Sequence, residues 1–214
     1  FAQMSEAAGG MLTGDSILFV DGFDRALKIP DKGYPGMSLQ KTESEKAIRG
    51  SNEGFGDSIK QNTALIRKRL RSVDLKVAEC KCGRRTGTNV DIMYLDGVVR
   101  PEIVTQMQQR LAAFEIDGIG DSGVIEQLTE TQWFSPFPQY QTTRRPDRAV
   151  MALLEGRAVL LADNSPEVLI FPTDYNSFIK TTDDYYTRWE IATFTRTLRY
   201  VAAFLSMILP GLYL

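Results

Sequence analysis

Short apolar runs alternate with longer amphipathic stretches along most of this chain. Runs of strand length, bounded by Asp, Asn, Gly or Pro, predict strands at residues 15–21, 76–84, 89–95, 115–117, 158–162 and 168–171. Apolar residues at helical spacing predict helices from 57 or 58 to about 71, from Pro101, from Ser122 and over 146–155. Strands that alternate with helices are typical of the α/β class.

The chain divides at a polar break, Ser72-Val73-Asp74. We expect a first α/β subdomain over residues 1–72, incomplete at its N-terminus, and a second over 75–180. Residues 181–214 are predicted to form a membrane-proximal helix and the start of a first transmembrane segment. The stretch 30–52, rich in Gly, Lys, Glu and Ser without a sustained period, is interpreted as an exposed loop.

The C-terminal stretch carries no charged residue from Tyr200 onward. A membrane-spanning helix needs about twenty apolar residues, so the sequence is expected to stop as such a helix begins. Arg188, Arg196 and Arg199 precede this run, and basic residues mark the cytoplasmic side of a membrane segment. The alternative is a buried core helix with these arginines on one polar stripe. From this stretch alone, both interpretations stay open.

Composition excludes several function classes. The 214 residues carry a formal net charge of −2 with both signs interspersed, which argues against a nucleic-acid surface. There is no histidine, so Ser-His-Asp and Cys-His catalysis and the common zinc sites are excluded. Cys80 and Cys82 lie two apart on a predicted strand and are poorly placed to bridge each other. These absences remove most hydrolases.

One glycine motif keeps an enzymatic alternative open. Gly118, Gly120 and Gly123 form G-x-G-x-x-G in the run GIGDSG, with Ser122 as the expected cap of the next helix. A phosphate could lie at such a helix N-terminus. However, a dinucleotide site also needs an acidic residue about twenty residues further on, where this chain has TQWFSPFPQ. The alternative function is a stand-alone soluble nucleotide-binding enzyme that uses this loop.

Three long blocks carry a resemblance to a known family. They read RGSNEGFGDSIKQNTALIRKRLRS, VDIMYLDGVV and PFPQYQTTRRPDRAVMALLEGRAVLLADNSPEVLIFP, and DDYYTRW and FTRTLRYVAAFLSMILPGLYL follow them. The sequence from about residue 15 to 214 resembles the A subunit of the GerA-type spore germinant receptors. This resemblance implies the soluble N-terminal domain of a multi-pass membrane protein, cut where the first membrane helices begin.

The resemblance also implies partners and a location. Such A subunits work with a B subunit of transporter-like fold and a lipid-anchored C subunit in the spore inner membrane, with this domain on the cytoplasmic (core) side. They are thought to self-associate into a nutrient-gated ion channel. The expected fold is two α/β subdomains with mixed sheets, similar to those of substrate-binding proteins, followed by a long membrane-proximal helix. The expected function is receptor assembly and germination signalling or ion release, with no catalytic residue, no metal and no cofactor.

Two departures from the family pattern bear on this expectation. Arg144 stands where a Glu is usual before Arg-Pro-Asp, which puts in doubt any contact made there through a carboxylate. Asn164 stands where a Gly is common. Because Asn tolerates positive φ, we expect the turn at Asn164 to form.

The candidate ligand-binding residues are Asp96, Gly97, Arg145 and Asp147, which could line a cleft between the two subdomains. A structural role for Arg145 and Asp147 is the main expectation. Pro146 starts a helix, Asp147 complements its dipole, and the Arg145 guanidinium is free to pair with a carboxylate at a strand end. Asp96 is the first choice for that partner.

Overall fold

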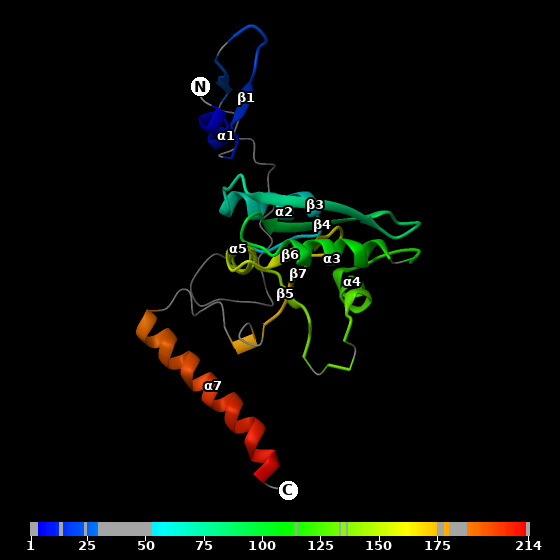
Figure 1. Cartoon of the computed structure of the whole chain (residues 1–214), viewed down its shortest axis with the longest axis vertical. Coiled ribbons are helices and arrows are strands. Elements are labelled where there is room, and N and C mark those ends of the chain that lie inside the picture. Colours follow the sequence, from blue (N-terminus) through cyan, green and yellow to red (C-terminus); the bar gives the residue numbers. More distant parts are fainter. Residues whose placement is uncertain are drawn as a thin grey trace.

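The computed structural model describes residues 4–12, 15–23, 25–29, 53–113, 115–132, 134–135, 137–174, 178–179 and 188–212. Two sheets and six helices lie within these ranges (Figure 1). The α/β class is confirmed. The predicted loop at 30–52 lies outside the described residues.

The main sheet has five strands in the order β3-β4-β6-β7-β5. Their bounds are Leu75–Cys82 (β3), Thr88–Leu95 (β4), Gln141–Thr143 (β5), Ala158–Ala162 (β6) and Val168–Phe171 (β7). Every neighbouring pair is antiparallel, whereas a mixed sheet was expected. Short connections explain part of the difference, because β3-β4 and β6-β7 are hairpins, and the two strands of a hairpin are antiparallel.

Helices cover both faces of this sheet. On one face lie α2 (Ile59–Arg69) and α5 (Pro146–Leu154), and on the other lie α3 (Pro101–Ala112) and α4 (Ser122–Thr129). Alternate residues of each strand therefore enter different cores: Met93 packs with α2 and α5, and Ile92 packs with α3. All residues of β6 and β7 are buried, which accounts for their unbroken apolar runs.

The α2 helix packs against the main sheet although it precedes the predicted boundary. Ile59 and Ile66 share a core with Met93 of β4. The backbone N–H of Ile59 also donates to Asp163 Oδ1 at 3.2 Å, so a residue that follows β6 holds the first turn of α2. The division of the chain at residues 72–75 stays a prediction.

The segment 115–117, predicted as a strand, forms none. It lies beside the turn between β3 and β4, where the backbone N–H of Arg84 donates to Ile116 O at 2.7 Å and that of Arg85 to Asp117 O at 2.8 Å. These bonds satisfy the backbone without a partner strand in the sheet.

The elements near the two ends of the chain lie outside the main sheet. Near the N-terminus, α1 (Met4–Leu12) precedes a two-stranded antiparallel sheet of β1 (Ser16–Leu18) and β2 (Leu27–Ile29). The β1 strand is shorter than the strand predicted at 15–21. At the other end of the molecule lies α7, Trp189–Leu212, a helix of 24 residues (Figure 1). Among the residues that the structure describes, no helix combines the length and apolar character needed to cross a bilayer.

Candidate functional site

The start of α5 holds two of the four candidate residues in one contact. Pro146 occupies the first turn, and Arg145 is the N-cap residue in an extended conformation. The Arg145 side chain is buried, with 2% of its surface exposed. Its guanidinium forms a bidentate ion pair with the Asp147 carboxylate: Nε donates to Oδ1 at 3.1 Å and Nη2 donates to Oδ2 at 2.7 Å. This paired geometry is the strongest that arginine and a carboxylate can form.

Backbone groups fix the same pair from both sides. The N–H of Arg145 donates to Thr143 Oγ1 at 3.1 Å, which ties the helix start to β5. The N–H of Arg148 donates to Asp147 Oδ1 at 3.0 Å, so the carboxylate also accepts from one of the first-turn N–H groups that the helix backbone itself does not pair. The expected structural role of Arg145 and Asp147 at this helix start therefore has a geometric basis.

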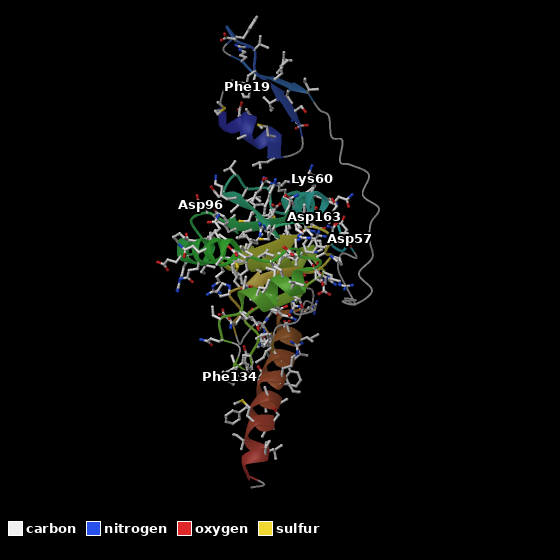
Figure 2. The ribbon with its side chains drawn as sticks, turned by 90° about the vertical axis from the view of Figure 1, so that its right-hand side faces the viewer. Phe19, Asp57, Lys60, Asp96, Phe134 and Asp163 are labelled. Carbon is white, nitrogen blue, oxygen red and sulfur yellow. The ribbon has the colours of Figure 1, made fainter. Side chains whose placement is uncertain are left out.

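The expected partnership between Arg145 and Asp96 is wrong. Asp96 is exposed at the end of β4, and its Oδ1 accepts the N–H of Gly97 at 3.1 Å. Figure 2 shows Asp96 at the left of the central part of the molecule and Asp57, Lys60 and Asp163 at the right. Arg145 instead uses a carboxylate two residues away, since burial favours the partner that the helix start already supplies.

Asp96 and Gly97 form a turn of their own. Gly97 has φ +78°, a left-handed conformation that favours glycine. No hydrogen bond or ion pair links this turn to Arg145 or Asp147 within the described residues. A ligand role for either pair stays a prediction.

The two departures from the family pattern also have clear positions. The guanidinium of Arg144 donates to Glu167 Oε1 from Nη2 at 2.8 Å and from Nε at 3.1 Å, and both side chains are partly exposed. Asn164 has φ +63°, so the expected turn is formed.

The GIGDSG loop ends in a helix N-terminus that already holds a negative charge. Asp121, and not Ser122 as expected, caps α4: its Oδ1 accepts the N–H of Ser122 at 2.6 Å. The hydroxyl of Ser165 also donates to this oxygen, and these hydrogen bonds lower the pKa of Asp121. A phosphate placed here would meet the Asp121 carboxylate. The loop is therefore unsuited to the nucleotide site of the alternative function.

A second acidic group lies between the sheet and α2, and sequence reasoning missed it. Asp91 of β4 accepts a hydrogen bond from Thr63 Oγ1 at 3.3 Å. Burial raises the pKa of Asp91, and the nearby charges of Glu79 and Asp163 raise it further. No set of three or more potential ligands in the described ranges is arranged to hold a metal ion.

The comparisons with known proteins agree on one family. The model of the Bacillus/Clostridium GerA spore germination protein matches residues 1–214. Spore germination protein KA of Bacillus subtilis (strain 168) is 36% identical over 203 residues, 95% of this chain and 37% of that protein. Spore germination protein B1 of the same organism is 36% identical over 213 residues, 100% of this chain and 44% of that protein. An uncharacterized membrane protein, YfkQ, also from Bacillus subtilis (strain 168), is 37% identical over 99% of this chain and 41% of its own length. The chain thus spans less than half the length of these relatives.

A solved structure gives the same result for the fold. It is the crystal structure of the N-terminal domain of the A subunit of the Bacillus megaterium spore germinant receptor GerK3. The two chains are 33% identical with a TM-score of 0.58, and the match covers 80% of this chain and 60% of that one. Because the family model matches residues 1–214, this chain belongs to the Bacillus/Clostridium GerA spore germination protein family.

Proposed function

We propose that this chain is the N-terminal domain of a spore germinant receptor A subunit, and that it takes part in receptor assembly and in nutrient-triggered signalling or ion release. One observation carries the proposal: the likeness to the GerK3 A-subunit domain extends over 80% of the chain at 33% identity. The relatives named as spore germination proteins support it. The domain needs no catalytic group in this role, and we propose that it is not an enzyme.

The proposed partners are the receptor B and C subunits, further copies of the A subunit, and the spore inner membrane through the C-terminal segment. The character of α7 supports the last of these. Its N-terminal half carries Arg196 and Arg199, while Phe204, Met207 and Leu209 further along are all more than half exposed. Basic residues followed by an apolar surface fit a helix that approaches a membrane from the cytoplasmic (core) side.

The predicted subdomain division belongs to the same proposal. In it, residues 1–72 and 75–180 form two α/β subdomains similar to those of substrate-binding proteins. The packing of α2 on the main sheet supports a close association between the end of the first subdomain and one sheet face of the second. Forces on one part would then reach the other through the shared core.

The test uses the full-length subunit together with its B and C partners, in spores that lack their own copy. Nutrient-triggered ion release and the amount of subunit in the inner membrane are measured with this domain present or deleted. We expect ion release to be lost on deletion. If ion release and the subunit in the membrane are both lost, the domain acts in receptor assembly. If ion release is lost at normal subunit levels, the domain acts in signalling. Normal subunit levels with normal ion release would refute the proposal.

A further inference from the structure

A cavity of about 370 Å³ lies on the sheet face that α3 covers. One wall is α3, and the opposite wall comes from the chain that leads into β5 and from the end of β7. The lining residues that matter for a ligand are Met107 and Arg110 on α3 and, opposite them, Phe137, Gln139, Tyr140 and Phe171. Cavities of this size are within the range that small-molecule sites occupy.

The α3 wall follows from helical spacing. Ile103, Gln106, Met107 and Arg110 fall at i, i+3, i+4 and i+7, so they form one stripe along the helix. The stripe changes character along its length, from apolar at Ile103 to cationic at Arg110. A ligand along this stripe would need an apolar end and an anionic end.

Two buried donors in this cavity have no hydrogen-bond partner. The Tyr140 hydroxyl is one, in a residue that is 3% exposed, and the Gln139 Nε2 amide is the other. The Gln139 Oε1 atom accepts from both the N–H and the hydroxyl of Thr131, each at 3.2 Å, which fixes the direction of the amide. Buried donors without a partner are rare in folded proteins and call for an explanation.

Arg110 adds the positive charge. Its Nη1 donates to Thr129 O at 3.2 Å, and no acidic side chain in the described part of the chain pairs with it. The Thr129 hydroxyl donates to Ile125 O at 2.6 Å, and neither Thr129 nor Arg110, although both lie beside the Tyr140 hydroxyl, makes a well-formed hydrogen bond with it. Burial raises the pKa of Tyr140, Thr129 and Arg110 beside the hydroxyl lower it, and the charge of Glu130 raises it. The hydroxyl therefore stays a donor at neutral pH.

We propose that this cavity binds a small monocarboxylate with an apolar substituent. Tyr140, Gln139 and Arg110 all offer donors, so the missing group is an acceptor, and one guanidinium matches one carboxylate. Met107, Phe137 and Phe171 provide apolar surface for the substituent. A nucleotide fits less well, because its phosphates would bring several negative charges to a single arginine.

The first experiment measures binding by calorimetry with this chain. The probe is 3-phenylpropionate, and its neutral, nearly isosteric amide is the control ligand. We expect the carboxylate to bind at least about tenfold more tightly than the amide, because only the carboxylate can pair with Arg110. Equal binding of the two, or no carboxylate binding up to about 10 mM, would overturn the proposal.

Two variants then test the named donors. Each should weaken carboxylate binding about tenfold or more: Arg110→Gln removes the positive charge and Tyr140→Phe removes the hydroxyl donor. Arg144→Gln is the control, at an exposed arginine paired with Glu167, and it should leave binding unchanged. Tyr140→Phe should also melt at the same or a higher temperature without ligand, since the hydroxyl it removes has no partner. A lower melting temperature with unchanged binding would show that an ordered water satisfies Tyr140, and the proposal would fail.

Discussion

Replacing Arg145 with Ala tests the structural role at the start of α5. The substitution removes both hydrogen bonds to Asp147 and leaves a carboxylate that is 12% exposed without this partner. Removing one member of a buried ion pair typically costs about 3–5 kcal/mol. For a domain of this size, 1 kcal/mol corresponds to roughly 2–4 °C in melting temperature, so we expect a fall of about 6–20 °C.

Arg144→Ala is the matched control. It removes an arginine from the neighbouring position, but the ion pair with Glu167 has side chains that are 41% and 37% exposed. Partly exposed pairs contribute about 0–1 kcal/mol, so the melting temperature should fall by at most a few degrees. Thermal unfolding followed by circular dichroism measures both variants. An unchanged melting temperature for Arg145→Ala, or equal shifts for the two variants, would refute the structural role.

Two further predictions concern the cap of α4 and the turn after β4. Hydrogen bonds lower the pKa of Asp121 in the folded chain, so its carboxylate adds stability above the unfolded value of about 3.9, and this stability is lost as the pH falls toward the folded pKa. Chemical denaturation between about pH 5 and pH 3 should therefore show a shallower loss of stability for Asp121→Asn than for the unmodified chain, and parallel curves would contradict the cap. Gly97→Ala should lower the free energy of unfolding by about 1 kcal/mol, because Gly97 has φ +78°. Gly120→Ala should change it less, because the φ of Gly120 is not positive and an added Cβ there would contact nothing within 4 Å. Equal denaturation midpoints for these two variants would contradict the strain argument.

Much of the main sheet can be predicted from local sequence. The strands at 158–162 and 168–171 agree with β6 and β7 because both are buried on two faces and are unbroken apolar runs. Pro146 marks the start of α5 for a similarly local reason. In contrast, β5 has only three residues, Gln141–Thr143, and so short a run cannot show the alternation that marks a strand.

Features that depend on distant parts of the chain could not be predicted. Strand direction is one, since alternation of apolar residues is the same in parallel and antiparallel sheets. Asp163 holds the first turn of α2 from 104 residues away, and no local pattern indicates this. The predicted partner of Arg145 is wrong for the opposite reason, because the adjacent helix turn supplies the carboxylate and no distant strand end is needed. The unpartnered hydroxyl of Tyr140 likewise becomes visible only when its neighbours are in place.

Nutrient-triggered ion release from spores tests the central claim most directly, with the full-length subunit carrying either Arg145→Ala or Arg144→Ala beside its B and C partners. If this domain folds around the Arg145–Asp147 pair and serves in receptor assembly, Arg145→Ala spores should lose the subunit from the inner membrane and lose ion release in proportion. Arg144→Ala spores should keep both, because that ion pair is partly exposed. Normal subunit levels and normal ion release in Arg145→Ala spores, with the isolated domain shown to be destabilised, would contradict the claim that receptor function depends on this fold.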